Sequence, residues 1–252
     1  MSTDDEPDLP ATYAEVWGVR VRPTKGPKRG LTLEQIVAAG VAVASAEGLD
    51  AVSMSRLASE LGLSAMALYR YVKSKDQLVD LMVDQALGTA MVEERSGKGG
   101  DWRARLEAWA LAELAAYRVH PWALLVPIKG PSIAPNQVRW LELGLRCLRE
   151  LKIEPYERIS VILMVTNYTR SWASLSGSLQ LALQSGDQDT LALHTHYAHF
   201  LRRLASREEF PALFEIVDSG IFEMADEEPD FDFAFGLARI LDGIEAYAAR
   251  NL

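Results

Sequence analysis

The sequence predicts an all-α protein with an N-terminal three-helix domain that contains a helix-turn-helix and a larger helical domain after it. Apolar residues recur at helical spacing along most of the chain, and no segment alternates apolar and polar residues as a half-buried strand does. The Gly-rich segment 96–100 separates the two helical regions. With 252 residues, 49% of them hydrophobic, the chain can bury one or two cores.

Residues 1–30 contain few large apolar groups and are predicted to form a largely disordered extension. Its second half is basic, from Arg20 to Arg29, and either follows DNA as an arm or is a plain leader. The first ten residues lack the apolar centre of a secretory signal. No run approaches the ~18 apolar residues that a membrane span needs, so we expect a soluble, cytoplasmic protein with no membrane partner.

Strong helix signals mark residues 31–95, the predicted N-terminal domain. Residues that cap or end helices occur in regular order: Thr32 with Gln35, Gly48, Ser53, Gly62, Ser64 and Ser74. They predict three helices up to residue 75 and a fourth that continues to about residue 94.

Residues 53–75, SMSRLASELGLSAMALYRYVKSK, have the pattern of a helix-turn-helix. Leu68 and Val72 are buried by spacing, which leaves these side chains outward: Ala65, Met66, Ala67, Tyr69, Arg70 and Tyr71. Tyr and Arg reach phosphates, whereas small and apolar groups touch base edges and thymine methyls. Lys75 begins the next helix, where its amide and ammonium suit a phosphate. The alternative is an ordinary helical hairpin.

The charge distribution favours DNA as the partner. Residues 20–75 hold nine basic and four acidic residues, a net charge of +5, within a chain of net charge −9. The other residues hold 17 basic and 31 acidic residues, a net charge of −14. A basic module on an acidic body is typical of a protein that docks on a polyanion through one face.

The predicted C-terminal domain, residues 101–252, is helical throughout. Asp101 caps a helix, and Pro121 to Pro135 divide the following segment into short pieces. A long helix begins near Pro155, and its segment ISVILMV, residues 159–165, is apolar on every side, which predicts that it runs through a core. Two more helices are expected, at 188–207 and 229–250. The single cysteine, Cys147, is expected to be a buried, unreactive side chain.

Residues 32–80 resemble the DNA-binding domain of the tetracycline-repressor (TetR) family of bacterial transcriptional regulators. The resemblance rests on A-x-x-x-x-x-G-L-D-A-V-S-M at 42–54 and on RLASELGLSAMALYRYVKSK at 56–75, whose L-Y-x-[HY]-V-x-x-K end is specific. H-P-W and G-P-x-x-x-P-N-x-x-x-W within residues 117–149 resemble the all-helical C-terminal domain of the same family. The resemblance implies a homodimer that binds a palindromic operator in double-stranded DNA. A small-molecule effector in the C-terminal core would release it, and repression is the family default.

Carried over residue by residue, the resemblance places Ala65, Met66 and Ala67 against bases. It places these residues against phosphates: Ser53, Tyr69, Arg70, Tyr71 and Lys75. Two positions depart from the family pattern. Ser55 stands where many relatives have Arg, so it contacts DNA only weakly or through water, and the operator sequence is not implied. Tyr71 stands where His is more common, and its hydroxyl still donates to a phosphate.

The C-terminal region is rich in aromatic residues, which suit a ligand pocket when a few polar groups accompany them. The set comprises Trp102, Trp109, Tyr117, Trp122, Trp140, Tyr168 and Trp172. Simple core packing is the alternative for each of them. Asn167 and Ser171 share a helix face by spacing. Under the family resemblance some of these residues line a cavity, and we expect the ligand contacts to be Trp109, His120, Trp140, Asn167 and Ser171.

Other chemistry finds little support in the sequence. His194, His196 and His199 form H-x-H-x-x-H, but only two of them share a helix face, so pocket-rim or surface histidines are expected and no metal. No cofactor is expected. There is no phosphate-binding glycine loop, nucleophile elbow or H-E-x-x-H motif, so the chain is not expected to be an enzyme. A ligand carrier or a non-specific DNA organiser that retains the fold is the alternative function.

The last predicted helix carries the expected dimer face. Gly236 and Gly243 are seven residues apart with Ile240 between them, and Phe233 and Ile244 flank this face. Small residues among large ones let two helices approach closely. Together with the second half of the 155–185 helix, this helix is expected to form a four-helix bundle with a second copy; burial within one chain is the alternative.

Overall fold

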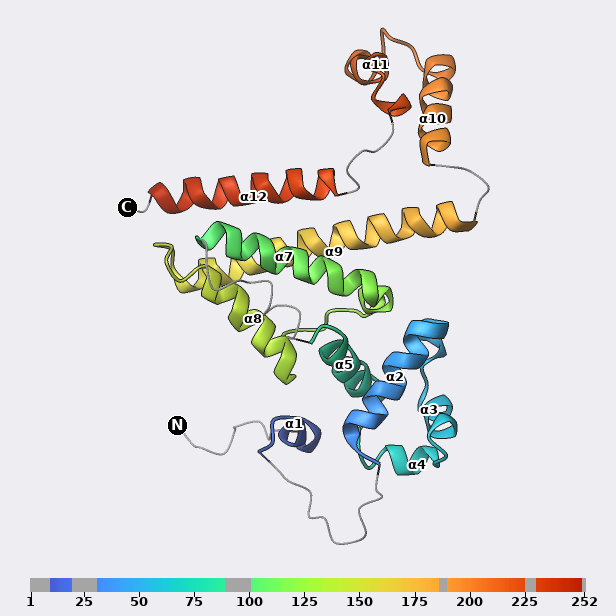
Figure 1. The fold of residues 1–252 in the computed structure, drawn as a ribbon, viewed down its shortest axis with the longest axis vertical. Coiled ribbons are helices and arrows are strands. Elements are labelled where there is room, and N and C mark those ends of the chain that lie inside the picture. The colour runs from blue at the N-terminus through green and yellow to red at the C-terminus, as the bar shows by residue number, and fades with distance from the viewer. Residues whose placement is uncertain (1–9, 20–30, 89–100, 186–189, 225–229, 251–252) are drawn as a thin grey trace. The chain divides into compact units, whose positions relative to one another are not determined.

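The structure is a computed structural model of the chain, and it describes residues 10–19, 31–88, 101–185, 190–224 and 230–250. Every regular element in these ranges is helical, as the sequence predicts (Figure 1). The chain forms two compact units, residues 1–173 with 240–252 and residues 174–239. The first unit contains both the helix-turn-helix and several helices of the C-terminal region, and the domain boundary expected at residues 96–100 stays a prediction.

The DNA-binding domain consists of five short elements. They are α2 (Leu33–Glu47), the 3-10 turn η2 (Leu49–Ala51), α3 (Met54–Glu60), α4 (Ala65–Leu68) and α5 (Lys75–Ala86). Thr32 and Gln35 exchange two hydrogen bonds, of 3.2 and 2.9 Å, which confirms the predicted capping box. Helix α2 lies close against α5 because Gly40 has no side chain, and a Cβ at this position would lie 2.7 Å from Met82 Sδ.

The fourth helix is shorter than predicted. Helix α5 ends at Ala86, where the N–H of Leu87 still donates to the carbonyl of Val83. Gly88 follows, and glycine is a weak helix former, which accounts for the end at this point. Residues 89–100, including the predicted boundary at 96–100, lie outside the described part of the chain.

A helix that the sequence did not predict, α1 (Ala11–Val16), packs against the DNA-binding domain. The Thr12 hydroxyl donates to the carbonyl of Tyr71 at 3.0 Å, and the Tyr13 hydroxyl donates to Asp80 at 2.6 Å. The prediction of disorder is therefore wrong for residues 11–16, because hydrogen bonds to distant residues hold this segment although its local apolar content is low. The predicted basic arm, residues 20–29, lies outside the described residues.

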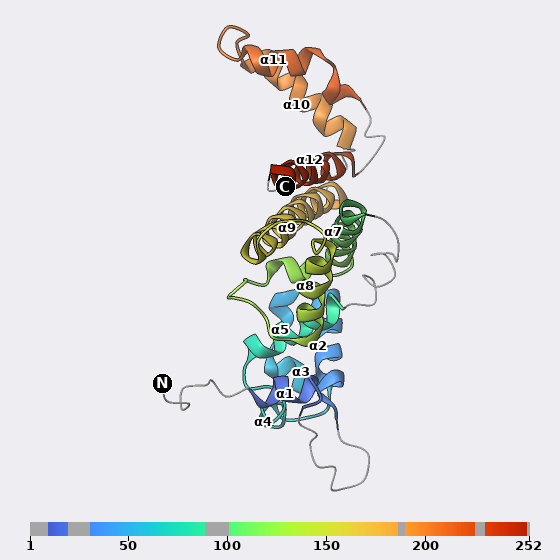
Figure 2. The same cartoon turned by 90° about the vertical axis from the view of Figure 1, so that its left-hand side faces the viewer.

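The C-terminal helices of the first unit pack around buried aromatic residues. These elements are α7 (Trp102–Val119), η3 (Pro121–Leu125), α8 (Pro135–Cys147), the first part of α9 (Pro155–Ser185) and the last part of α12 (Phe231–Arg250). Helices α7, α8 and α9 lie beside one another in both views (Figures 1 and 2). Trp109 is fully buried, and a Cβ at Gly144 would lie 2.8 Å from Ile162 and 3.0 Å from Trp109. Cys147 is buried as predicted.

The long helix α9 does not run through a core on all sides. Val165 and Ile162 are buried, but Ile159, Leu163 and Met164 are 40%, 56% and 44% exposed. The prediction that residues 159–165 are enclosed is thus wrong for the described part of the chain, which leaves one apolar face of this segment exposed.

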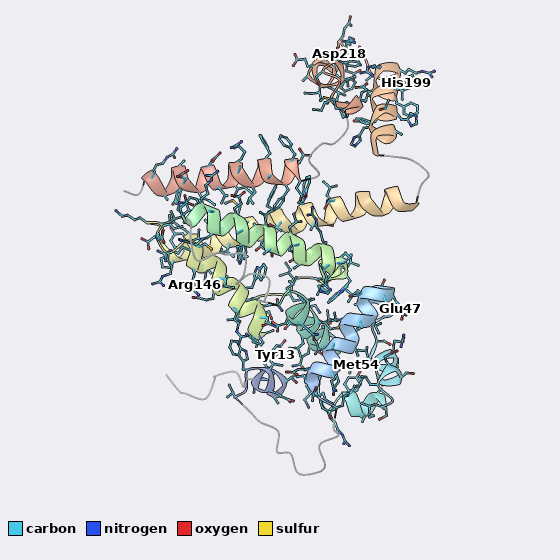
Figure 3. All side chains as sticks on the ribbon, in the orientation of Figure 1. Tyr13, Glu47, Met54, Arg146, His199 and Asp218 are labelled. Atoms are coloured by element: carbon cyan, nitrogen blue, oxygen red, sulfur yellow. The ribbon has the colours of Figure 1, made fainter. Side chains whose placement is uncertain are left out.

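In the second unit, α10 (Thr190–Leu204) packs with α11 (Pro211–Asp218) and the 3-10 turn η4 (Ile221–Glu223). Arg202 donates to Glu223 at 2.6 Å and to the carbonyl of Val217 at 2.8 Å. Asp218, labelled in Figure 3, pairs with Arg207. The sequence predicted α10 and α12 but not α11.

Candidate DNA-binding surface and ligand cavity

The turn between α3 and α4 has the predicted helix-turn-helix construction. Ser53 Oγ accepts from the N–H of Arg56 at 3.1 Å, and Ser64 Oγ accepts from the N–H of Ala67 at 3.3 Å. Gly62 has a φ of +67°, the left-handed conformation that glycine adopts without steric cost. Leu68 and Val72 are fully buried. These contacts fix α4 with its remaining side chains directed away from the core.

The predicted DNA-contact residues surround α4 on the outside of this turn. Met66 and Tyr69 are 77% and 43% exposed. The other exposed members are Ser55, Arg70 and Lys75, whereas Ser53, Ala65, Ala67 and Tyr71 are partly buried. An exposed apolar side chain flanked by hydroxyl and basic groups suits a DNA groove, and the individual contacts remain predictions.

The basic residues of this surface differ in their surroundings. Arg56 forms ion pairs with Glu60 and, at 2.9 Å, with Glu47, so acidic neighbours offset its charge. Arg70, Lys73 and Lys75 are exposed at the end of α4 and the start of α5. Exposed basic side chains are therefore grouped where α4 leads into α5.

A cavity of about 740 Å³ lies in the first unit between α5 and the helices α7, α8 and α9. Trp109 and Trp140 form an apolar part of its wall, with ring centroids 5.6 Å apart and planes tilted by 43°. Trp109 Nε1 donates to the carbonyl of Trp140 at 3.1 Å, which fixes the first ring. The volume and the aromatic wall are typical of a site for a small organic molecule.

One end of the cavity is a buried polar group that we call the Glu113 corner: Glu113, Tyr117, Thr166 and Arg170. Glu113 is 3% exposed, and burial raises its pKa to about 8 although Arg170 and the hydroxyls of Thr166 and Tyr117 favour the charged form. Arg170 Nη1 donates to Tyr117 Oη at 2.9 Å, and Nη2 donates to the carbonyl of Leu124 at 3.3 Å. Glu113 Oε2 is buried and accepts no hydrogen bond.

The other end is the Asp80 cluster: Tyr13, Asp80, Ser132 and Gln137. Asp80 Oδ2 accepts from Tyr13 at 2.6 Å and from Ser132 at 3.0 Å, and Oδ1 accepts from Gln137 Nε2 at 3.2 Å. Figure 3 shows Tyr13 on α1, and its hydroxyl bonds to α5. The cluster ties α1, α5, the 126–133 segment and α8 together.

Asp84, one turn further along α5, extends this connection to α8. Its Oδ1 accepts from the N–H of Gln137 at 2.8 Å, and its carbonyl accepts from Asn136 Nδ2 at 3.2 Å. Asp84 is 5% exposed, and burial raises its pKa to about 6. The helix that begins at the DNA-binding surface is thus fixed to the start of α8 by two carboxylates.

Comparisons with known proteins now identify the family. Residues 36–82 match the family of bacterial regulatory proteins called tetR, and residues 96–248 match the tetracyclin repressor-like C-terminal domain. The chain belongs to the TetR family. It is 37% identical to the HTH-type transcriptional repressor DrrR1 of Streptomyces coeruleorubidus, across 99% of this chain and 90% of that protein.

Solved structures of TetR-family proteins share the fold. Apo ActR from Streptomyces coelicolor aligns with a TM-score of 0.72 at 24% identity, over 90% of this chain and all of ActR. ActR in complex with actinorhodin aligns with a TM-score of 0.71 over 87% of this chain and 99% of ActR. As a TetR-family member with a helix-turn-helix domain, the chain is a transcriptional regulator and not an enzyme.

The structure brings together only part of the ligand-contact set expected from the TetR resemblance. Trp109 and Trp140 line the cavity. Asn167 and Ser171 share a face as predicted, but it is the exposed face of α9, outside the cavity lining. His120 ends α7, with its ring 6.0 Å from that of Trp122, and is also outside the lining. Spacing fixes which residues share a face, whereas packing decides which face is enclosed.

The Glu113 corner was not predicted, although the sequence contains a signal for it. Leu106, Trp109, Glu113 and Tyr117 recur every three or four residues, so the apolar stripe of α7 passes directly through a glutamate. Burying a charged carboxylate costs considerable free energy unless it is paired or hydrogen-bonded, so a glutamate in an apolar stripe indicates a polar site.

The three histidines of the H-x-H-x-x-H segment lie on α10. His199 and His196 are exposed on α10 (Figure 3 labels His199), and His194 is partly buried. Within the described part of the chain, no three His, Cys, Asp or Glu side chains are grouped to hold a metal. Nor is any helix among the described residues long and apolar enough to span a membrane.

Proposed function

We propose that this chain is a cytoplasmic, ligand-responsive repressor that binds a palindromic operator as a homodimer and releases it when an apolar or aromatic small molecule fills the cavity. The observation that supports the proposal is that α5 contacts both the DNA-binding surface and the cavity. Lys75, Asp76 and Gln77 begin α5 next to the DNA-binding surface and also line the cavity, as do Val79 and Asp80 further along. A ligand that displaces α5 therefore displaces the DNA-binding surface.

Small displacements are sufficient for release. The two recognition helices of a dimer must lie about 34–36 Å apart to enter successive major grooves. A tilt of α5 that changes this spacing by several ångströms loses the match. To shift the protein from nearly all bound to nearly all free, the ligand must prefer the released conformation by roughly 5.5 kcal/mol.

Helix α1 adds a second link between the cavity and the DNA-binding surface. The Thr12 hydroxyl contacts the carbonyl of Tyr71, which follows α4, and also Gln77 Oε1 at 3.2 Å. The neighbouring Tyr13 belongs to the Asp80 cluster. A ligand that moves Asp80 would therefore also move α1, which contacts the residues that follow α4.

Relatives support this direction of regulation. DrrR1 is named a transcriptional repressor, and ActR has been crystallised with actinorhodin bound. The Trp109–Trp140 wall gives this chain an aromatic surface on which a ring system can stack.

The homodimer interface is proposed from an exposed face of the first unit. Ile159, Leu163 and Met164 give α9 an exposed apolar stripe, which lies in the first half of this helix and not in the second half named from the sequence. On α12, Gly243 is exposed, and a Cβ there would have no atom within 4 Å. The predicted flanking residues Phe233 and Ile244 are instead buried within the chain, so this part of the predicted face is wrong: the face of α12 that carries Gly243 is rotated away from them.

The dimer is tested by sedimentation of Gly243→Leu beside the wild type. An isobutyl group at an open position between paired helices should loosen the dimer and weaken operator binding together, because each copy binds one half-site. Leu163→Ala, on the exposed apolar stripe of α9 in the same unit, serves as a second probe. A wild type that sediments as a monomer at micromolar concentration would contradict the dimer.

The function is tested by selecting operator sequences from a random duplex library and measuring affinity against salt. A repressor should enrich a palindrome and bind it far more tightly than random DNA, with affinity that falls steeply as salt rises. A DNA organiser would bind without sequence preference. A ligand carrier would quench its tryptophans with small molecules yet enrich no sequence.

A further inference from the structure

The inward face of α7 contains one ionisable side chain that the fold does not satisfy. Glu113 stands one turn from Trp109 and one turn from Tyr117, and it is 3% exposed. Its Oε2 atom is buried without a hydrogen-bond partner. Leaving a buried acceptor unpaired costs free energy, so the lack of a partner among the described residues points to a partner from outside the chain.

The remaining members of the Glu113 corner are already engaged. The Tyr117 hydroxyl accepts from Arg170, and the hydroxyls of Tyr117 and Thr166 donate toward the Glu113 carboxyl group. The guanidinium of Arg170 is fixed by Tyr117 and by the carbonyl of Leu124 and lies over the Tyr117 ring, 5.2 Å from its centroid. Glu113 Oε2 is therefore an acceptor in a rigid setting, and Glu113 lines the same cavity as Trp109 and Trp140.

We propose that Glu113 Oε2 accepts a hydrogen bond from a hydroxyl group of the effector, so that the cavity selects neutral, hydroxylated polycyclic aromatic molecules. The rings would stack at the Trp109–Trp140 wall while the hydroxyl reaches the Glu113 corner. This assignment rests on the proposed function, because it names the class of effector for the same cavity.

The charge of Arg170 decides between a hydroxyl and an ammonium group. Arg170 is the basic residue whose charge acts on Glu113, and it favours the ionised form of that carboxyl group. A cationic ligand would bring a second positive charge beside a fixed guanidinium in a site of low dielectric. A neutral hydroxyl satisfies Oε2 without this repulsion. The site discriminates strongly because a ligand without the donor leaves a buried acceptor unpaired.

The protonation of Glu113 gives the proposal a second observable. Burial raises the pKa of Glu113 to about 8, against the opposing effects of Arg170 on α9, Thr166 on α9 and Tyr117 on α7. The ionised carboxylate is the stronger acceptor. Affinity for a neutral hydroxyl ligand should therefore rise with pH between pH 6.5 and pH 9 and level off above the pKa, with a proton released on binding.

The test uses four probes with one ring system: anthracen-9-ylmethanol, its methyl ether, 9-ethylanthracene and anthracen-9-ylmethylamine. Binding to the full chain is followed by quenching of tryptophan emission and by calorimetry. The alcohol should bind roughly ten- to hundredfold more tightly than the ether and the ethyl compound, and more tightly than the amine. Glu113→Gln should remove most of this preference, whereas Glu107→Gln, an exposed position on the same helix, should keep it.

Three outcomes would overturn the proposal. Equal affinity for the alcohol and its ether would show that Oε2 accepts nothing from the ligand. Tighter binding of the amine would assign the site to cations. Affinity for the alcohol that falls as pH rises would make Glu113 a donor and not an acceptor. The pH series needs only the wild type, so it decides even if Glu113→Gln does not fold.

The binding measurements contain no DNA, so they test the effector class independently of operator release. If the alcohol binds as expected but never releases an operator, the effector assignment stands and the repressor mechanism fails. If the alcohol and the ether bind equally and both release DNA, only the effector assignment fails.

Discussion

The two ends of the cavity each present a carboxylate, but the two carboxylates differ in how completely the protein satisfies them. Asp80 accepts hydrogen bonds from Tyr13, Ser132 and Gln137, residues from three different segments. Glu113 is more deeply buried, and its Oε2 atom has no hydrogen-bond partner among the described residues. The satisfied group acts as a structural tie, whereas the unsatisfied group is available to a ligand.

This difference indicates how binding and release are divided within one cavity. The Glu113 corner lies on α7 and α9, away from the DNA-binding surface, and suits recognition of the effector. The Asp80 cluster lies on α5 and α1, the two elements that reach the DNA-binding surface, and suits transmission. A ligand large enough to touch both ends would couple them.

The largest expected effect concerns stability against pH and is specific to the Glu113 end. The pKa of Glu113 is raised in the folded state to about 8, above an ordinary value of 4.5, so the folded state holds a proton that the unfolded state loses. The free energy of unfolding should therefore fall as pH rises from about 5 to 8, by roughly 3–5 kcal/mol for this group.

Urea unfolding across this pH range measures the effect, and Glu113→Gln should flatten the slope. Asp84, whose pKa is raised to about 6, contributes in the same direction over a lower range, so the difference between variant and wild type isolates Glu113. Glu107→Gln should retain the wild-type slope. Identical slopes in all three proteins would contradict the burial of an ionisable Glu113.

The next largest effect is expected from a substitution that disrupts the Asp80 cluster. Asp80→Ala should lower the free energy of unfolding by about 2–3 kcal/mol, because it leaves Tyr13, Ser132 and Gln137 without their acceptor. Chemical denaturation at pH 7 measures it, with Asp76→Ala as the control, since Asp76 is exposed and pairs only at the surface with Lys129. If Asp80→Ala lowered the free energy of unfolding as little as Asp76→Ala does, the Asp80 cluster would not connect these segments structurally.

A milder substitution tests whether α1 couples the cavity to the DNA-binding surface. Tyr13→Phe removes one of the three donors to Asp80 and should cost about 1 kcal/mol of stability. It should reduce operator release at saturating ligand more than it reduces ligand affinity. The reason is that it removes the hydrogen bond between α1 and Asp80 and leaves the Glu113 corner unchanged. Tyr197→Phe, on α10 in the second unit, is the control. Unchanged release would remove α1 from the coupling.

The smallest effects are expected from substitutions that change the DNA-binding surface and leave the cavity unchanged. Lys75→Ala should weaken binding to all DNA sequences by a similar factor and reduce the salt slope by about one unit, as expected for a phosphate contact. Met66→Ala should instead alter which sequence is preferred. Lys152→Ala, exposed between α8 and α9, is the matched control. Affinity that is unchanged by Lys75→Ala at every salt concentration would be incompatible with the proposed docking.

The DNA-binding domain could be predicted from the sequence because its signals are local. Ser53, Gly62 and Ser64 act within three residues of their own positions, and the structure confirms each of them. The cavity could be predicted only in part, since Trp109 and Trp140 line it while Asn167 and Ser171 lie on the outer face of α9. Helix α1 was missed because Thr12 and Tyr13 bond to residues about 60 positions away in sequence.

The most direct test of the central claim is reciprocity between ligand and operator. The affinity of the tightest cavity ligand is measured by tryptophan quenching with and without saturating operator duplex, and operator affinity is measured with and without that ligand. Because linkage is symmetric, each should weaken the other by the same factor. A ligand that quenches the tryptophans with equal affinity in both conditions would contradict the claim that filling this cavity releases DNA.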